Sequence, residues 1–553
     1  MGLPLGIIAD TFNLATSQHI STLHLISVYL FINCLNYGQL HFYCTTMKPS
    51  SLRFIPILLL CAYNLLAQNN LQKVTAFRKA NEQQIIEEYL KFVAIPDETN
   101  DSVSIPLNTA YIMDMLKKRG VNAELLKPVF GNPVVFGEVK VPGATKTINF
   151  YAHYDGQPVN PKQWAPGLKP FEPVFITKPI EQGGTIINYQ PGMNIDPDWR
   201  ITGRASADDK ADIMCIINAY EALVKSGVTP TCNIKFFFEG EEEKSSPHLA
   251  EIFRKYKDKL VSDVWIICDG PRHISGKKMV VFGVRGDVNM RLTVYGPKRP
   301  LHSGNYGNWA PNPGLMLAQL LAGMKDEKGH VTIKGFYNDV VPLSETEKAA
   351  IKKMPSAEAE LKKDLGVAEP EGGERSLTEG FMQPGLNING MASGNVGSIA
   401  ANVIPVKAEA VLDLRLVLGN DVDRQIQKVT GYIKAQGYYV IDREPTDEER
   451  QKYGKIIKVT HDVGYNAQRT PMDLPIAQSV IKAVQSTVDY PVVLTPTMGG
   501  SLPLFVFEKE LGAKVITMPL VNYDNNQHAE NENVKISFLW EGIETIAAIM
   551  EMK

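Results

Sequence analysis

Cysteine is scarce in this sequence, with six residues among 553. Three of them lie before residue 62, and the other three are Cys215, Cys232 and Cys268, in or beside apolar runs. An odd number in such positions argues against a disulfide framework and is typical of buried free thiols. We therefore expect these three cysteines to be core residues, even in an oxidising compartment.

The sequence also lacks a strong excess of either charge. Its formal net charge is −3, and no basic stripe is present, which argues against a nucleic-acid partner. Internal repeats and low-complexity tracts are absent as well. With 44% hydrophobic and 21% charged residues the composition is that of a soluble globular protein, and the length predicts about two to four domains.

The apolar run Phe54–Ala67 is too short for a membrane-spanning helix. It follows two cations, Lys48 and Arg53, and the small Ala67 precedes a polar stretch, which is the layout of a secretory signal peptide. We interpret residues 47–67 as this signal peptide and residues 1–46 as a non-native or disordered extension. A periplasmic or secreted protein is then expected, with membrane anchoring as the alternative.

Helical and strand patterns alternate from about residue 77. Segment 209–226 has apolar residues at helical spacing, whereas segments 233–238 and 264–268 are interpreted as continuous apolar strands and segment 147–151 as a further strand. Strands that are apolar on both faces and alternate with helices predict a mostly parallel sheet flanked by helices. The predicted fold class is therefore α/β.

The pattern changes near Gly286. Segments 289–295 and 408–415 alternate with period two, as strands with one exposed face do, and each precedes a helical segment. We therefore expect an inserted α+β domain over residues 286–442. The α/β domain would comprise residues 68–285 and 443–553.

Three predicted core strands lead directly into acidic residues or histidine: strand 147–151 into His153 and Asp155, strand 233–238 into Glu239-Gly-Glu-Glu-Glu243, and strand 264–268 into Asp269. In an open parallel sheet, ligands bind at the carboxyl ends of the strands. A solvated acidic face, a helix cap or a core histidine would explain each feature alone. Their joint occurrence favours a functional site.

Two further carboxylates, Asp208 and Asp209, stand at the start of the predicted helix 209–226, where capping explains one of them. A mixed set of histidine and carboxylate suits zinc or a similar divalent ion. The carboxylates are too many for one four-coordinate ion. Two ions ~3.5–4 Å apart that share a carboxylate and a water would use them all.

The segments Gly203-Arg-Ala-Ser-Ala-Asp-Asp-Lys210, Glu239–Glu243 and Leu301-His-Ser-Gly304 together resemble the dinuclear-zinc peptidases that include carnosinases, aminoacylases, carboxypeptidase G and acetylornithine deacetylase. The resemblance covers residues 81–553. Segment 326–345 is similar to the carnosinase-like dipeptidase branch. The resemblance implies that the inserted domain is a lid that often dimerises, so we expect a homodimer through this domain.

The resemblance also implies site residues. His153 and Asp269 would bind one zinc, Glu243 and His528 the other, and Asp208 would bridge them, giving two Zn²⁺ per subunit with Mn²⁺ or Co²⁺ as alternatives. Glu242 resembles the general base, and Asp155 the acid that orients His153. The Asp208–Asp209 peptide bond is expected to be cis. Glu241 is expected to be a spectator and Glu239 to support the loop.

On the substrate side, His302 resembles the lid histidine that polarises the scissile carbonyl, usually in the partner subunit's site. Arg415 resembles the arginine that binds the substrate's carboxylate, for which a planar guanidinium is well suited. Asn402 and Ser501 occupy other substrate-contact positions. Ala205, Ala211 and Ser245 depart from the family pattern, which usually has glycine there. These changes affect loop geometry and no ligand, so they bear on fine specificity more than on activity.

The expected function is a secreted dinuclear zinc metallopeptidase. It would hydrolyse amide bonds of dipeptides or short peptides with a free carboxylate, through metal-activated water and a glutamate base. An N-acyl-amino-acid deacylase with the same metal chemistry is the alternative. A catalytically silent binding module is a third interpretation, but such relatives usually lose a ligand or the base, and here all of these positions are filled.

Overall fold

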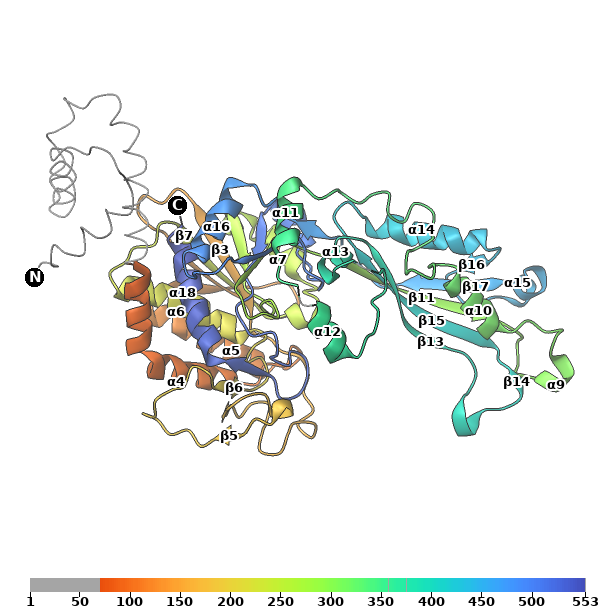
Figure 1. Ribbon diagram of the computed structural model, residues 1–553, viewed down its shortest axis with the longest axis horizontal. Coiled ribbons are helices and arrows are strands. Elements are labelled where there is room, and N and C mark those ends of the chain that lie inside the picture. Colours follow the sequence, from red (N-terminus) through yellow and green to blue (C-terminus); the bar gives the residue numbers. More distant parts are fainter. Residues whose placement is uncertain (1–69, 357, 374, 553) are drawn as a thin grey trace, which may run out of the picture. The chain divides into compact units, whose positions relative to one another are not determined.

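The computed structural model describes residues 70–552 except residues 357 and 374 (Figure 1). The predicted extension and signal peptide, residues 1–46 and 47–67, lie outside the described residues. Within the described part of the chain, no helix is long and apolar enough to cross a membrane.

The main sheet has eight strands, mostly parallel in its centre. In spatial order they are β1 (Asn122–Leu126), β2 (Val134–Val139), β7 (Asn233–Glu239), β3 (Thr147–His153), β8 (Val264–Ile267), β20 (Val515–Thr517), β9 (Met279–Val281) and β19 (Val493–Thr495). Strands β7, β3, β8 and β20 run parallel, whereas β1 and β2 are antiparallel at one edge. The prediction of a mostly parallel α/β sheet is confirmed.

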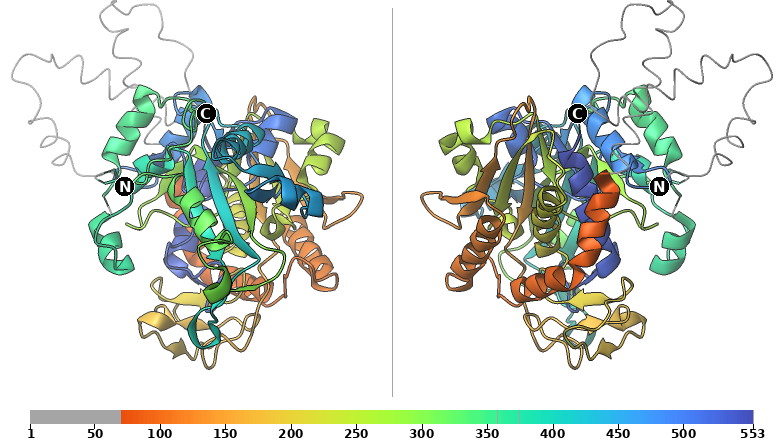
Figure 2. Two further views of the ribbon diagram at one scale, coloured as in Figure 1. Left: turned by 90° about the vertical axis from the view of Figure 1, so that its right-hand side faces the viewer. Right: turned by 90° about the vertical axis from the view of Figure 1, so that its left-hand side faces the viewer.

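Helices cover both faces of the main sheet (Figure 2). One face packs against α4 (Glu82–Val93), α5 (Ser104–Lys118), α6 (Lys210–Lys225), α16 (Pro475–Gln485) and α18 (Ile536–Met550), and the other against α7 (Leu249–Lys255), α8 (Lys257–Leu260) and α17 (Phe505–Leu511). On β7, Phe236 and Phe238 belong to the first core and Phe237 to the second. This two-sided burial explains the continuous apolar sequence of the strand.

The inserted domain contains a five-stranded sheet. Its order is β13 (Gly385–Ala392), β15 (Lys407–Leu416), β11 (Gly286–Tyr295), β17 (Ile456–His461) and β16 (Tyr439–Ile441), with α10 (Pro313–Ala322) and α14 (Val422–Ala435) packed on one face. The alternating burial of β15 matches its period-two sequence. At the tip, β12 (Leu301–His302) pairs with β14 (Val403–Ile404), followed in sequence after β12 by α9 (Ser303–Tyr306).

The structure differs from the predicted inserted domain, residues 286–442, in two ways. Strand β17 lies beyond residue 442 and pairs with β11, so the smaller sheet extends one strand further than predicted. In addition, α11 (Glu345–Lys353) contacts β19 of the main sheet, and Met354 packs against Met279 and Val281. Only a few apolar residues of this polar segment make the contact, too few for periodicity to reveal it.

The remaining elements are short. A four-stranded sheet contains β21 (Asn533–Lys535), β6 (Arg200–Thr202), β4 (Phe175–Ile176) and β5 (Ile186–Ile187), and β10 (Gly283–Val284) pairs with β18 (Gln468–Arg469) where the chain enters and leaves the smaller sheet. Further helices include α12 (Glu358–Leu365), α13 (Leu377–Phe381) and α15 (Asp447–Lys452). As predicted, Cys215, Cys232 and Cys268 are buried and free.

Candidate metal centre and active site

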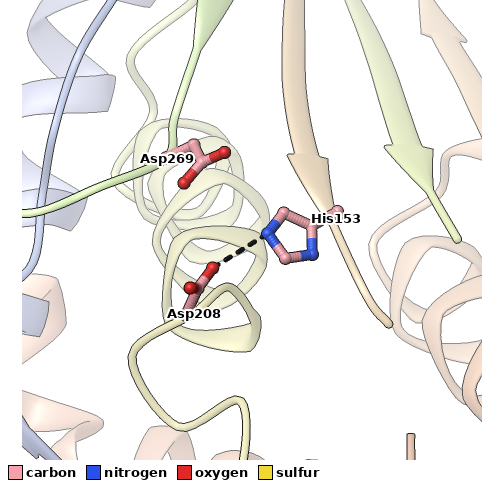
Figure 3. Close-up of side chains that lie close together, drawn as sticks. All are labelled: His153, Asp208 and Asp269. Atoms are coloured by element: carbon pink, nitrogen blue, oxygen red, sulfur yellow. Dashed lines mark hydrogen bonds and ion pairs between the residues drawn. The ribbon is translucent and has the colours of Figure 1, made fainter. Parts of the chain in front are cut away.

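Three adjacent strands position the predicted acidic and histidine residues. Strand β3 pairs in parallel with both β7 and β8, so the carboxyl ends of all three meet at one edge of the sheet. His153 is the last residue of β3, the glutamates follow β7, and Asp269 follows β8. The start of α6 brings Asp208 to the same place (Figure 3).

His153, Asp208 and Asp269 form one group of possible metal ligands. One ligand atom of each residue lies within 4.8 Å of the others, and all three residues are buried. His153 Nε2 is 2.9 Å from Asp208 Oδ1, the contact drawn in Figure 3. This group therefore lies inside the protein, with its donors already facing one another.

Asp208, Glu243 and His528 form a second group of the same kind. His528 Nε2 lies 3.1 Å from Asp208 Oδ2 and 3.1 Å from Glu243 Oε2. The His528 side chain, in the loop between β20 and β21, is 57% exposed, so this group opens toward solvent. Asp208 thus faces His153 with one oxygen and His528 with the other, as a bridging carboxylate would.

Asp155 connects these groups to the glutamate loop. Its carboxylate accepts hydrogen bonds from the backbone amides of Glu242 and Glu243, at 3.1 and 3.2 Å, and from Thr99 Oγ1 at 2.8 Å. His153 Nδ1 lies 3.0 Å from the backbone oxygen of Asp155 and 3.5 Å from Oδ1 of its carboxylate. One buried aspartate is therefore placed to hold both the imidazole and the loop.

The comparisons with known proteins identify the family of this chain. The family model for peptidase family M20/M25/M40 matches residues 149–552. The chain belongs to this family. It is therefore a metallopeptidase, and the predicted resemblance is confirmed.

Among the relatives of this M20 peptidase are two groups of dipeptidases. The Cys-Gly metallodipeptidase of Saccharomyces cerevisiae is 27% identical over 430 residues, covering 76% of this chain and 82% of its own length. The human Beta-Ala-His dipeptidase is 25% identical over 427 residues, covering 75% of this chain and 76% of its own length. These relatives agree with the carnosinase-like branch.

Solved structures show the same fold. The M20 family metallo-carboxypeptidase of Sulfolobus solfataricus superimposes with a TM-score of 0.68 and 26% identity, covering 85% of this chain and 98% of the other. Human carnosine dipeptidase 1 gives a TM-score of 0.62 at 22% identity, covering 87% of this chain and 98% of the other. The M20 peptidase fold is thus shared over 85–87% of this chain and 98% of each of the two solved structures.

The electrostatics of the site fit the binding of divalent cations. Burial raises the pKa of Asp269 to about 7, and the neighbouring carboxylates of Asp208 and Glu243 add to this against the effect of His153. Burial also acts to raise the pKa of Asp208, but hydrogen bonds with His153 and His528 outweigh it and hold this pKa below its usual value. Crowded carboxylates beside two imidazoles match the donors that zinc and similar ions prefer.

The loop of this M20 peptidase that carries Asp208 is held by a residue that the sequence analysis missed. Glu532, which is fully buried, accepts hydrogen bonds from the backbone amides of Ala205, Ala207 and Asp208, and its carboxylate pairs with Arg204. Glu532 lies in a polar stretch and looks like a surface acid in the sequence. Its partners lie more than 300 residues away, so no local pattern could identify it.

The Asp208–Asp209 bond is cis, as predicted. The expectation that one of the two aspartates caps the helix is not supported, because Asp209 occupies the N-cap position of α6 without a side-chain cap bond. Instead, its Oδ2 accepts a hydrogen bond from the backbone amide of His153 at 3.0 Å. Asp209 therefore ties the end of β3 to the start of α6.

Two departures from the expected glycine pattern adopt unusual backbone angles. Ala205 has φ 57° and Ser245 has φ 66°, in the left-handed region that favours glycine. The loops that carry Asp208 and the glutamates thus keep a conformation suited to glycine at both positions. The effect of these departures on fine specificity stays a prediction.

Glu242 lies at the rim of the metal centre of this M20 peptidase. Its Oε2 is 3.9 Å from His153 Nε2, and its side chain is 14% exposed. Burial raises its pKa well above the usual value, and the Asp269 and Glu243 carboxylates add to this against the effect of His153. A carboxylate that holds a proton this readily is suited to accept one from water.

Glu241 was expected to be a spectator, and the structure gives it three polar contacts in a buried position. The residue is 2% exposed, and its carboxylate meets Lys244 Nζ at 3.0 Å, His248 Nδ1 at 2.7 Å and the Asn132 amide at 3.0 Å. The neighbouring Glu239 is buried and accepts a hydrogen bond from Tyr151, in keeping with its expected support of the loop. In the sequence, a run of acids does not show which members point inward.

Two of the substrate-side residues lie together. Arg415 on β15 donates from Nη1 to Ser501 Oγ at 2.8 Å, which joins the smaller sheet to the loop that follows β19. His302 and Asn402 lie elsewhere, exposed at the tip of the smaller sheet in β12 and just before β14 (Figure 1). The described chain therefore does not bring His302 and Asn402 to its own metal centre.

Proposed function

We propose that this peptidase hydrolyses dipeptides or short peptides that carry a free carboxylate, using two divalent cations, with Zn²⁺ as the first choice and Mn²⁺ or Co²⁺ as alternatives. The observation that carries the proposal is the position of Asp208, which offers one oxygen to each of two ligand groups. In this proposal His153 and Asp269 hold one ion, and Glu243 and His528 hold the other. The dipeptidases among the relatives support the substrate class.

When bound, two such cations would supply Lewis acidity that activates water and polarises the scissile carbonyl. Glu242 would accept the proton of the attacking water and return it to the leaving nitrogen. Asp155 would keep His153 and the amides of Glu242 and Glu243 in place through its hydrogen bonds. Arg415 would bind the substrate's carboxylate.

The exposed position of His302 and Asn402 is consistent with a homodimer through the lid domain. Exposed apolar side chains accompany them in this domain, among them Trp309 and Val396, which are 81% and 83% exposed. In a dimer through this surface, His302 and Asn402 would serve the site of the partner subunit. We further propose that the leader, residues 47–67, directs the protein to the periplasm or outside the cell, with a membrane anchor as the alternative.

The replacement Glu242→Gln tests the assignment of the base. We expect kcat to fall by about 10²–10⁴-fold, because glutamine cannot accept a proton, while bound metal and melting temperature stay near those of the wild type. The matched control is Glu172→Gln, which removes an exposed ion pair with Lys169. Full activity of a metal-replete Glu242→Gln variant would contradict the proposed mechanism.

The deacylase alternative shares the metal chemistry and differs in the group on the acyl side of the amide. Steady-state kinetics of the purified enzyme on dipeptides and on N-acetyl amino acids separate the two functions. We expect kcat/KM to be higher for the dipeptides. A clear preference for the N-acetyl amino acids would replace the proposed function by a deacylase.

A further inference from the structure

Two aspartates that the proposed mechanism does not use lie beside Arg415. Asp413 is two residues before Arg415 on β15, so both side chains project from the same face of the strand. In the antiparallel register of β11 and β15, Asp287 lies directly opposite Arg415. Three charged side chains are thus brought together by the geometry of the smaller sheet.

The contacts show which atoms of the guanidinium are taken. Arg415 Nε lies 3.0 Å from Asp413 Oδ1 and 3.1 Å from its Oδ2, and 3.6 Å from Asp287 Oδ1. Nη1 donates to Ser501 Oγ at 2.8 Å. In the described part of the chain, Nη2 donates no hydrogen bond. The Nε side of the Arg415 guanidinium therefore faces the two aspartate carboxylates, and its Nη1–Nη2 edge keeps N–H donors for a ligand.

The surroundings hold this arrangement in place. Asp413 is 9% exposed, whereas the Arg415 side chain is 34% exposed and so accessible from solvent. The other cross-strand neighbour of Arg415 is Gly385 on β13, where an added Cβ would lie 3.0 Å from Arg285 Nη2 and 3.7 Å from Arg415 Cβ. The absence of a side chain at this position leaves room for two guanidinium groups.

Arg285 completes a set of two cations and two anions. Its Nη2 donates to the backbone oxygen of Gln383, just after α13. Burial lowers the pKa of Arg285 to about 10, and Arg415 adds to this against the two aspartates. Burial raises the pKa of Asp287 to about 6, against the effect of Arg415, and the Asp413 carboxyl adds to this. The charges are thus close enough to influence one another.

We infer that Asp413, supported by Asp287, is a positioning residue for the substrate's carboxylate. By holding Arg415 through Nε, it fixes a long and flexible side chain so that the Nη1–Nη2 edge can bind a carboxylate with two parallel hydrogen bonds. The inference rests on the proposed function, in which Arg415 binds this carboxylate. It identifies Asp413 as a determinant of the preference for substrates with a free carboxylate.

The replacement Asp413→Asn tests this role with a dipeptide and the C-terminal amide of the same dipeptide. We expect KM for the free dipeptide to rise about tenfold with kcat within about twofold, because binding is weakened and the reacting atoms are not touched. The kcat/KM for the amide should stay within about twofold of the wild type. A purely structural role for Asp413 would instead lower activity on both substrates alike, and that result would overturn the inference.

A matched control is Asp462→Asn. Asp462 forms an exposed ion pair with Arg291 on the smaller sheet, with Arg291 Nη2 at 2.9 Å from its Oδ2. The same chemical change there should leave KM for both substrates unchanged. Equal effects of the two replacements would overturn the inference.

A second variant, Asp287→Asn, keeps the test decisive if Asp413→Asn does not fold. We expect KM for the free dipeptide to rise about two- to fivefold, because Asp287 lies farther from Nε. If the wild type cleaves the dipeptide and KM is unchanged in whichever of Asp413→Asn and Asp287→Asn folds, the inference is overturned and the proposed function stands. Failure of the metal-replete wild type to cleave any dipeptide would overturn the proposed function and the inference together.

Discussion

The edge of the main sheet and the tip of the smaller sheet each carry a predicted functional histidine, but they are built differently. His153 is fully buried. Its Nδ1 contacts the backbone oxygen of Asp155, its Nε2 contacts Asp208, and its backbone amide donates to Asp209. His302 is exposed, and its Nδ1 accepts a hydrogen bond from Gly304 in the same loop. We interpret the difference as a division between a site that one chain completes and a surface that needs a second subunit.

The frame around the metal centre explains why it can be preorganised. Buried carboxylates that hold backbone amides fix the loops on which the possible ligands lie, as Glu532 does for Asp208 and Asp155 for Glu243. Hydrogen bonds to ionised groups are stronger than neutral ones, and a buried amide that loses its acceptor is costly. The tip of the smaller sheet has the two-residue strands β12 and β14, and its exposed side chains have more freedom to adapt to a partner.

The largest effect should follow from Asp208→Ala. This replacement removes the carboxylate that the two ligand groups share, so we expect loss of tightly bound metal and a fall in kcat/KM of at least about 10³-fold. Metal content by elemental analysis and kinetics with excess Zn²⁺ measure the two effects. The control Asp198→Asn removes an exposed partner of Lys535 and should change neither. Two tightly bound ions in Asp208→Ala would show that Asp208 is not the bridge.

A smaller but still large effect is expected for His302→Ala, about 10²-fold in kcat, if this histidine stabilises the transition state in the partner's site. Mixing inactive Glu242→Gln subunits with His302→Ala subunits sharpens the comparison. Each mixed dimer would then contain one complete site, so random exchange should restore about a quarter of the wild-type activity. No recovery after verified subunit exchange would mean that His302 does not act across a dimer.

The same comparison shows what the sequence could predict. The ends of β3, β7 and β8 were recognisable because continuous apolar strands lead into acids, and parallel strands bring their ends together. Glu532 could not be recognised, because its partners lie more than 300 residues away. Asp413 lies two residues before Arg415 on the same strand, but the sequence does not show that Asp287 of β11 stands opposite them. For the same reason the smaller sheet was predicted without β17, whose pairing with β11 spans more than 160 residues.

Removal of the metal should destabilise the protein in a pH-dependent way. In the metal-free protein the pKa of Asp269 is about 7, above its ordinary value of 3.8, so between these values the folded state binds a proton that the unfolded chain has released. The stability of the metal-free protein therefore falls as pH rises through this window. Bound cations act oppositely, because they bind the deprotonated carboxylate more readily at higher pH.

We therefore expect a chelator to lower the melting temperature by several degrees more at about pH 7.5 than at about pH 5.5. Adding Zn²⁺ back should restore the melting temperature, which serves as the control for damage by the chelator. Equal shifts at both pH values would indicate that the crowded carboxylates are not protonated in the metal-free protein. The lid tip carries no comparable set of buried acids among the described residues, so its contribution should not depend on the chelator.

The smallest effect is expected for Glu241→Gln, which tests whether the frame around the metal centre extends to this buried acid. Glutamine is neutral and has one acceptor oxygen in place of two, so it weakens the contact with Lys244 and cannot accept hydrogen bonds from His248 and the Asn132 amide on separate oxygens. We expect a loss of about 1–3 kcal/mol in the free energy of unfolding by denaturant titration. Because Asp155 still holds the amides of Glu242 and Glu243, kcat should fall by less than about tenfold.

The matched control for this prediction is Glu251→Gln, whose carboxylate accepts a hydrogen bond from the amide of Val129 at the surface. It should change the free energy of unfolding by less than about 0.5 kcal/mol. If Glu241→Gln were as mild as this control, the buried network would add nothing to the loop, and Glu241 would be the spectator that the sequence suggested. If Glu241→Gln is clearly more destabilising, the rigid frame of the metal centre includes Glu241, the residue before the proposed base Glu242, and nothing comparable stabilises the lid tip among the described residues.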